Sequence, residues 1–269
     1  MERFASFLEE DIGYGDITTD LIVPDIEGIA DIVCENDAVI AGLEEAVTIF
    51  EEYGVDCDPR VTDGERVKKG TKVMSLSGPL RNIITLERTA LNIMMRMSGI
   101  ATATNDVLIV CRKKNENVRI AGTRKTTPGF REFEKKAIML GGGDPHRYGL
   151  DDMILVKDNH IKAAGGIKNV IDSLKLAPFA KKVEIEVENM DDAIAAAEGG
   201  ADIIMIDNAN PAKAKGIADA VRKIRNVKIE VSGNITSENA ADYASFADVI
   251  SMGSLTHSVR AVHFSLSIR

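Results

Sequence analysis

KVEIEVENMDDAIAAAEGGADIIMIDN, residues Lys182–Asn208, decides the fold of this chain of 269 residues. Two short β-rich runs, VEIEV and IIMID, flank an alanine-rich segment that closes on two glycines. Such runs are typical of strands, and the segment between them is typical of a helix followed by a turn. The strand–helix–strand order predicts a parallel βαβ unit, because parallel strands need a long crossover connection.

The same alternation continues on both sides of this unit. Helical segments separate further β-rich runs, which read VRIAGTR from Val118, DMILVK from Asp152, VKIEVSG from Val227 and DVISMGS from Asp248. Six strands are therefore predicted, and VHFSLSI near the C-terminus is a candidate for one more. A parallel sheet, closed or nearly closed into an α/β barrel but short of the eightfold form, is the predicted fold.

The N-terminal part of the chain follows a different pattern and predicts a separate α/β unit. One or two strands are indicated within Gly28–Ala41, and an amphipathic helix fits Gly42–Gly54. A strand, a glycine turn and a second strand are predicted over Asp63–Pro79.

A long helical passage then marks the predicted domain boundary. Apolar residues recur at helical spacing from Leu80 to Asn115, with a break expected at Ser98-Gly99. We therefore assign residues 1–115 to an N-terminal α/β sandwich domain and residues 116–269 to the barrel. The C-terminal strand is a candidate for return to the N-terminal domain.

The bulk composition excludes several classes of protein. The formal net charge is −9 and the pI is about 5.1, which argues against a surface for nucleic acids or anionic membranes. Tryptophan is absent, so aromatic platforms for single strands are not expected. The odd number of cysteines, Cys34, Cys57 and Cys111, suggests free thiols. With neither a signal peptide nor an apolar run of about 20 residues, we predict a cytoplasmic protein.

Cationic side chains gather in Thr123–Ile161 of this otherwise acidic chain. The stretch holds Arg124, Lys125, Arg131, Lys135, His146, Arg147, Lys157 and His160. Carboxyl ends of parallel strands meet at one edge of a sheet, so the polar residues that follow the strands should surround one pocket. A local cation cluster there predicts a small, heavily anionic substrate, held by arginine forks and lysine point charges.

Acidic residues predict a second zone of the pocket. Glu184, Glu186 and Glu188 alternate along one strand, so all three are expected to point into the barrel. Glu186 and Asp207 would suit a hard cation such as magnesium, held largely through water.

Two strand ends predict a third zone, for phosphate. Ser232-Gly233-Asn234 and Gly253-Ser254 place backbone N–H groups at loops that lead into helices, an arrangement that binds phosphate at the last strands of barrels. Three other features are interpreted without a role in the pocket when each is taken alone. Glu87-Arg88 is typical of a surface ion pair, His257 is expected to be peripheral, and DIGYGDITTD is typical of turns and helix caps.

Long blocks of the sequence resemble the quinolinate phosphoribosyltransferase family. They read EDIGYGDITTD, ERTALNIMMRMSGIAT, TRKTTPGFR, KKAIMLGGGDPHRYGLDDMILVKDNHI, VEIEVE, IIMIDN, EVSGNI and ISMGSLTHS. They occur in the family's order and cover nearly the whole chain. TRKTTPG and the block from the three glycines to DNHI are the most specific.

The resemblance implies a fold and an assembly. The fold is the type II phosphoribosyltransferase architecture, an N-terminal α/β sandwich followed by an incomplete α/β barrel of about seven strands. The working unit is a head-to-tail homodimer, with higher oligomers left open, in which the neighbour's N-terminal domain closes each active site. Arg88, in ERTALN, matches the arginine that reaches in from the neighbour, which replaces its interpretation as a surface ion pair.

The resemblance also implies roles for the pocket residues. Those that match the surroundings of the quinolinate carboxylates are Arg124, His146, Arg147 and Lys157. Lys125 matches a lysine near both substrates, and we assign catalytic roles to Lys125, Glu186 and Asp207.

The phosphoribosyl donor has its own matches. Glu186 and Asp207 match an acidic pair near the ribose and magnesium, Mg²⁺ being the implied cofactor. The loops for the 5-phosphate are Ser232, Gly233, Asn234, Gly253 and Ser254. Asn234 stands where many members have a second glycine, and His263 where an aspartate is common.

The implied reaction joins quinolinate and phosphoribosyl pyrophosphate to give nicotinate mononucleotide, pyrophosphate and carbon dioxide in NAD biosynthesis. One alternative is a transferase of the same fold that acts on nicotinate, or the molybdenum-associated paralogue. Another is a Schiff-base aldolase with Lys157 as the nucleophile. A third is an anion-binding module without turnover.

Overall fold

The computed structural model describes residues 2–269, which divide into two compact units. The first unit comprises residues up to Ala103 together with Met139–Gly142 and Val259–Arg269. The second comprises Thr104–Ile138 and Gly143–Ser258. This division falls inside a long helix, whereas the sequence prediction placed the domain boundary after it, at residues 115 and 116. Among the described residues, none of the helices is long and apolar enough to cross a membrane.

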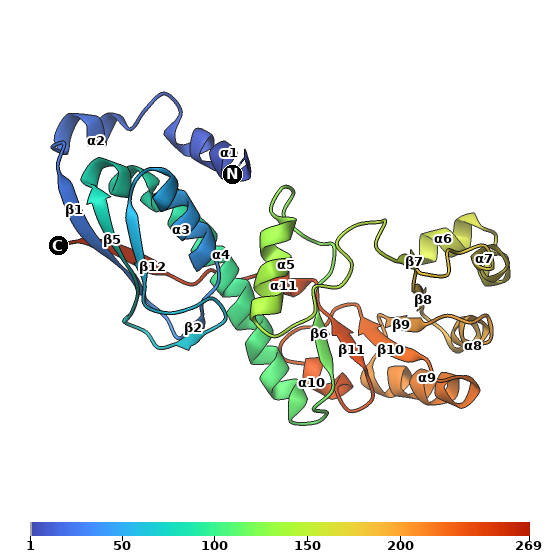
Figure 1. Cartoon of the computed structure of the whole chain (residues 1–269). Coiled ribbons are helices and arrows are strands. Elements are labelled where there is room, and N and C mark those ends of the chain that lie inside the picture. The colour runs from blue at the N-terminus through green and yellow to red at the C-terminus, as the bar shows by residue number, and fades with distance from the viewer. Residues whose placement is uncertain (1) are drawn as a thin grey trace. The chain divides into compact units, whose positions relative to one another are not determined.

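An antiparallel sheet is the centre of the first unit (Figure 1). Its strands follow the order β12-β1-β5-β3, which are Phe264–Ile268, Glu27–Cys34, Thr71–Pro79 and Asp56–Pro59. Alternate residues of β1 are buried, as expected for a strand with one face against a core. A two-stranded ladder joins β2 (Ala38–Val39) to β4 (Arg66–Val67). The helices of this part are α1 (Glu2–Ile12), α2 (Ile17–Ile22) and α3 (Leu43–Glu52).

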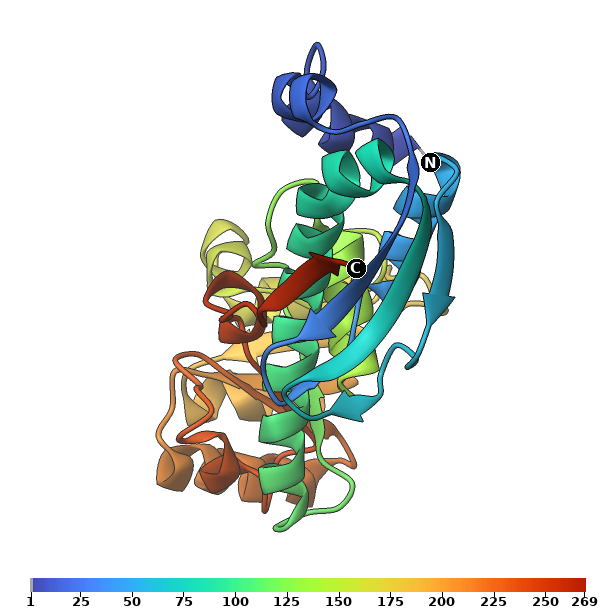
Figure 2. The ribbon, with the colours of Figure 1, turned by 90° about the vertical axis from the view of Figure 1, so that its left-hand side faces the viewer.

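The C-terminal strand belongs to this antiparallel sheet, not to the barrel. Figure 2 shows β12, in red, beside β1, and the two pair from Ala30 and Ile268 to Cys34 and Phe264. The candidate for a further barrel strand was therefore wrong. The ladder also brings Asp31 to Arg269, whose guanidinium donates two hydrogen bonds of 2.8 and 2.6 Å to the carboxylate.

Helix α4 runs without interruption from Leu80 to Arg112, so the expected break at Ser98-Gly99 was wrong. Ser98 is buried, and its hydroxyl is within hydrogen-bond distance of both the N–H and the carbonyl of Ala41. Gly99 leaves room for the backbone of Arg260, since a Cβ there would lie 2.3 Å from the carbonyl oxygen of that residue. Both residues serve packing of the helix.

A parallel six-stranded sheet forms the second unit. In sheet order its strands are β6 (Arg119–Ala121), β11 (Val249–Ser251), β10 (Lys228–Ser232), β9 (Ile203–Asp207), β8 (Val183–Val187) and β7 (Ile154–Val156). All six predicted strands are present. Within residues 2–269, β6 and β7 are not paired with each other, so the barrel is open. A single parallel bridge joins Ala121 to Asp144 at the free edge of β6, in place of the seventh strand that the resemblance implied.

The helices between and after the parallel strands are α5 (Arg131–Leu140), α6 (Asp158–Ala163), α7 (Ile167–Leu174), α8 (Met190–Glu198), α9 (Pro211–Ile224), α10 (Ala240–Tyr243) and α11 (Ser254–His257). From α6 to α10 they pack against one another in chain order (Figure 1). Asn189 and Asn210 cap the N-termini of α8 and α9, where each side-chain oxygen accepts the backbone N–H of the third residue of the helix. These caps start the helices directly after the strand ends, which leaves those ends open to a ligand.

Candidate active site

A pocket of about 740 Å³ lies at the carboxyl ends of the parallel strands and is lined by residues of the second unit alone. It gathers every predicted site residue except Arg88: Arg124, Lys125, His146, Arg147, Lys157, Glu186, Asp207, Ser232, Gly233, Asn234, Gly253 and Ser254. Three cations of the predicted cluster do not line it, namely Arg131, Lys135 and His160. His257, predicted to be peripheral, does line it.

Two arginines line the pocket close to each other, and one of them has an unpaired donor. The Nε of Arg124 is buried and has no hydrogen-bond partner. Arg147 is only 9% exposed, and the pKa of its guanidinium lies below its usual value because of burial and the nearby charge of Arg124. A bound dianion would accept a hydrogen bond from the unused donor and would offset the positive charges of the two adjacent guanidiniums.

The three cations of the cluster that do not line the pocket are Arg131, Lys135 and His160, and each makes a hydrogen bond with a backbone group near it. The Arg131 Nη1 donates to the carbonyl of Tyr148 at 2.9 Å, and the Lys135 ammonium donates to the carbonyl of Pro145. Both bonds fix the loop that carries Arg147. The Nδ1 of His160 accepts the backbone N–H of Lys157 at 2.8 Å, at the start of α6. These three members of the predicted cationic cluster therefore contact the backbone of the loops and of the α6 start, and they do not line the pocket.

Lysine and acidic groups meet on another wall. The Lys157 Nζ lies 2.6 Å from Oε2 of Glu186. Burial and the negative charge of Glu186 raise the pKa of Asp207, whose Oδ2 accepts a 2.6 Å hydrogen bond from Asn208. Crowded carboxylates with hard oxygen donors fit a magnesium ion, which would relieve their mutual repulsion.

Of the three glutamates expected to point into the barrel, Glu184 and Glu186 do so and Glu188 does not. Glu188 follows the last residue of β8 and is exposed, so it does not line the pocket. Glu184 is fully buried and lies outside the pocket lining. Only Glu186 occupies the strand end itself, because the strand finishes one residue later.

Two loops after β10 and β11 bring backbone close to the pocket. Gly233 has φ +84°, and a Cβ there would lie 2.4 Å from Oδ1 of Asn208. Asn234 follows with φ +52°, a backbone conformation that asparagine tolerates better than most residues. Its Nδ2 donates to Asn208 at 3.0 Å, so the departure from a second glycine is accommodated. Gly253 lies against Lys125, with 2.9 Å between a built Cβ and Cδ of that lysine.

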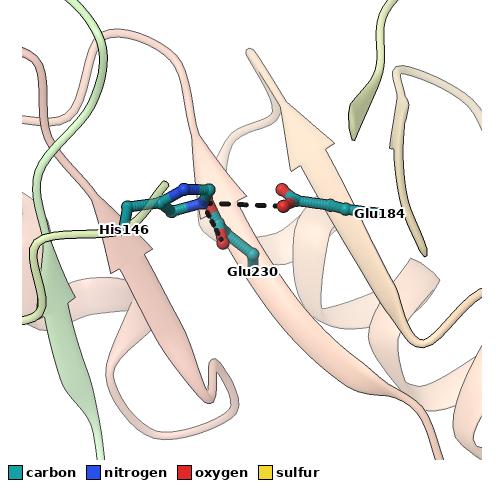
Figure 3. A group of neighbouring side chains, drawn as sticks. All are labelled: His146, Glu184 and Glu230. Carbon is teal, nitrogen blue, oxygen red and sulfur yellow. Dashed lines mark hydrogen bonds and ion pairs between the residues drawn. The ribbon is translucent and has the colours of Figure 1, made fainter. Parts of the chain in front are cut away.

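Sequence reasoning missed a buried group beneath the cations, formed by His146, Glu184 and Glu230 (Figure 3). The three side chains come from a loop, from β8 and from β10, and they point toward one another. Burial and the charge of Glu230 raise the pKa of Glu184 to about 8. Burial opposes protonation of His146, but its hydrogen bond to Glu230 and the two carboxylates outweigh this and raise its pKa. A single acidic residue inside VKIEVSG was the available signal for Glu230.

Arg88 lies on α4 in the first unit and its side chain is 59% exposed. Its guanidinium is 3.7 Å from the carboxylate of Glu87, the ion pair that the residues alone suggest. Arg88 does not line the pocket of its own second unit.

Two family models together match nearly all of the chain. The model described as quinolinate phosphoribosyl transferase, N-terminal domain, matches residues 16–98, and the C-terminal domain model matches residues 100–267.

Individual relatives agree with these matches. A probable nicotinate-nucleotide pyrophosphorylase [carboxylating] of Methanothermobacter thermautotrophicus is 42% identical, over 100% of this chain and 99% of its own. The human nicotinate-nucleotide pyrophosphorylase [carboxylating] is 36% identical over 87% and 80%. The solved structure of the nicotinate-nucleotide pyrophosphorylase from Francisella tularensis superposes with a TM-score of 0.94 at 34% identity, and covers 100% of this chain and 95% of its own.

Proposed function

The chain belongs to the quinolinate phosphoribosyltransferase family, and from this premise we propose how its pocket performs the carboxylating nicotinate-nucleotide pyrophosphorylase reaction. Phosphoribosyl pyrophosphate and quinolinate are converted to nicotinate mononucleotide, pyrophosphate and carbon dioxide. The enzyme is a pentosyltransferase of NAD biosynthesis.

Arg124 and Arg147 carry the assignment of the quinolinate subsite. One has a buried Nε without a partner, and the other is buried beside a like charge. A dicarboxylate supplies two separate anionic groups, one for each arginine fork, whereas a monocarboxylate leaves one fork unsatisfied. Lys157 stands at the border between this subsite and the acidic wall, because its ammonium is bonded to Glu186.

The phosphoribosyl donor would occupy the opposite side of the pocket. The loops Ser232-Gly233-Asn234 and Gly253-Ser254 would hold its 5-phosphate through backbone N–H groups. Lys125, which lies against Gly253, would reach both substrates. Glu186 and Asp207 would hold Mg²⁺, which when bound neutralises charge on the pyrophosphate leaving group.

The residues then act by orientation and by electrostatics. The arginine pair fixes quinolinate so that its ring nitrogen faces the anomeric carbon of the donor, and that nitrogen forms the new bond as pyrophosphate departs. The carboxylates of Glu186 and Asp207 stabilise positive charge that develops on the ribose. The carboxylate next to the quaternised nitrogen leaves as carbon dioxide, and a proton replaces it on the ring. No covalent intermediate with the protein is needed.

The assembly is proposed from the position of Arg88. An exposed arginine that does not line the active-site pocket of its own chain is available to a second copy, which would complete each site across a homodimer. The cytoplasm is the proposed location.

Product analysis with two acids tests the function. Purified protein, phosphoribosyl pyrophosphate and magnesium should release pyrophosphate and labelled carbon dioxide in equal amounts from quinolinate labelled in the carboxyl group beside the ring nitrogen. Nicotinate should give at least about a hundredfold less pyrophosphate, since loss of one buried charge-assisted contact costs roughly 3 kcal/mol. Omitting magnesium and adding a chelator should abolish both products. Equal turnover of nicotinate would overturn the assignment to quinolinate.

A further inference from the structure

Glu230 is a carboxylate in a pocket otherwise built for a dianion. It comes from the middle of β10, is 1% exposed, and contributes to the pocket lining beside Arg147 and His146. A buried negative charge beneath an anion site repels the ligand and costs desolvation energy unless hydrogen bonds compensate it. Its presence needs a structural reason.

The hydrogen bonds of His146 define its tautomer. Its Nδ1 accepts the backbone N–H of Arg147 at 2.8 Å, so Nδ1 carries a lone pair and Nε2 carries the hydrogen. Nε2 lies 3.3 Å from Oε2 of Glu230, close enough to donate to it, and 3.5 Å from Oε2 of Glu184 (Figure 3). The other oxygen of Glu230 accepts a 2.5 Å hydrogen bond from the hydroxyl of Ser251. Both oxygens of Glu230 are therefore occupied.

The backbone at His146 also needs support. Its φ of +54° is a left-handed conformation that costs a residue with a Cβ about 1 kcal/mol or more. Asp144 accepts the His146 N–H at 2.8 Å on one side, and the ring holds the next N–H on the other. The His146 ring thus stabilises the left-handed backbone conformation of its own residue, directly before Arg147.

We propose that Glu230 is a positioning residue for quinolinate binding, which acts through His146 on the backbone of Arg147. A series of hydrogen bonds links the Ser251 hydroxyl to Glu230, Glu230 to the His146 ring, and the ring to the Arg147 N–H. Both ring nitrogens are used inside the protein, so His146 serves the substrate by aiming the guanidinium of Arg147. This inference rests on the proposed function and adds a residue to its dicarboxylate subsite.

A metal ion is the competing explanation, because His146, Glu184 and Glu230 bring three ligand atoms within 4.8 Å of one another. A metal would need the lone pair of Nε2, which requires the hydrogen to sit on Nδ1. There it would face the N–H of Arg147, donor against donor, at 2.8 Å. The hydrogen-bonded tautomer and a metal ligand at Nε2 exclude each other, and the backbone contact favours the former.

Two variants of Glu230 separate hydrogen bonding from charge. In Glu230→Gln the amide oxygen can accept from Nε2 and the amide NH₂ can donate to the Ser251 hydroxyl, so the chain of bonds survives. Glu230→Leu has a similar volume and breaks it. We expect the leucine variant to raise KM for quinolinate about tenfold, the value of one buried hydrogen bond. KM for the phosphoribosyl donor should stay within about twofold, and the glutamine variant within about threefold for both.

The proposal would be overturned by a glutamine variant as impaired as the leucine variant, by equal rises in both KM values, or by a stoichiometric divalent ion in purified wild type that the glutamine variant lacks. Ser251→Ala, which removes one of the two bonds to Glu230, should shift KM for quinolinate in the same direction by a smaller factor. Ser251→Ala therefore tests the series of hydrogen bonds even if the leucine variant does not fold. Wild type that turns over quinolinate, with a leucine variant of unchanged KM, would sink this inference alone; wild type inactive on quinolinate would sink the proposed function.

Discussion

At the scale of single residues, burial decides what each cation of the chain does. Arg147 and Lys135 come from the same stretch of sequence and are both buried. Arg147 lines the pocket, whereas Lys135 extends under the loop, donates to the carbonyl of Pro145 and lies 5.2 Å from the ring centre of Tyr148. The sequence could predict that cations concentrate here, but the direction of each side chain depends on packing that no spacing reveals.

Lys135 should make stability depend on pH. Burial lowers its pKa to about 8, so folding holds a charged lysine at a cost of about 3 kcal/mol below pH 8. The cost falls as pH rises from the folded pKa toward the ordinary value of 10.5, because the unfolded chain then binds more protons than the folded one. Lys135→Met removes this titration.

The free energy of unfolding, measured by denaturant titration at pH 7 and pH 10, checks this prediction. Between these values, wild type should gain about 2 kcal/mol relative to Lys135→Met. Lys168→Met, on an exposed position of α7, controls for the loss of a lysine. A difference between wild type and Lys135→Met that stays constant with pH would contradict the buried titration.

At the scale of elements, the strands were predictable and the continuity of α4 was not. Period-two and β-branched runs such as VEIEV mark strands because local pattern matches burial. A glycine within a helical pattern predicts a break. Gly99 instead allows the backbone of Arg260 to approach the helix closely, and this is a contact between residues far apart in sequence. The sequence offered return of the C-terminal strand to the N-terminal domain as one candidate, but its pairing with β1 in particular depends on contacts between residues far apart in the sequence.

Two glycines in helices should therefore respond in opposite ways to alanine. Gly216→Ala in α9 meets no atom within 4 Å and should stabilise the protein by about 0.5–1 kcal/mol through helix propensity. Gly99→Ala should destabilise it by about 2 kcal/mol or more, because the new Cβ overlaps the Arg260 carbonyl. Thermal unfolding of both variants measures the effects. A stabilising Gly99→Ala would show that the approach of Arg260 does not require glycine.

At the scale of the whole molecule, the sequence motifs predicted the residues that line the pocket better than the buried residues that support them. Strand ends and the long TRKTTPG and DNHI blocks indicated the site residues predicted in the second unit, all of which line the pocket. Glu230, Ser251 and the burial of Glu184 escaped because an acidic residue inside an apolar strand gives no sign of its partners. Such partners become visible only when β8, β10 and the His146 loop come together.

The proposed dimer makes a prediction about mixed subunits. Arg88→Ala and Lys125→Ala should each be nearly inactive, since Arg88 and Lys125 belong to different compact units and would serve sites formed by two chains. Mixing them under conditions of subunit exchange should restore up to about a quarter of wild-type activity, because one in four sites receives both intact residues. Mixing without any recovery would argue against a shared site.

The central claim is that the buried arginines bind the dicarboxylate and not the phosphoribosyl donor. Steady-state kinetics of Arg147→Ala, with each substrate varied in turn, tests it most directly, and Lys162→Ala on α6 controls for loss of a nearby cation outside the pocket. We expect KM for quinolinate to rise at least about thirtyfold, the equivalent of roughly 2 kcal/mol, with KM for the donor within about twofold. Equal rises for both substrates, or an unchanged KM for quinolinate, would contradict the claim.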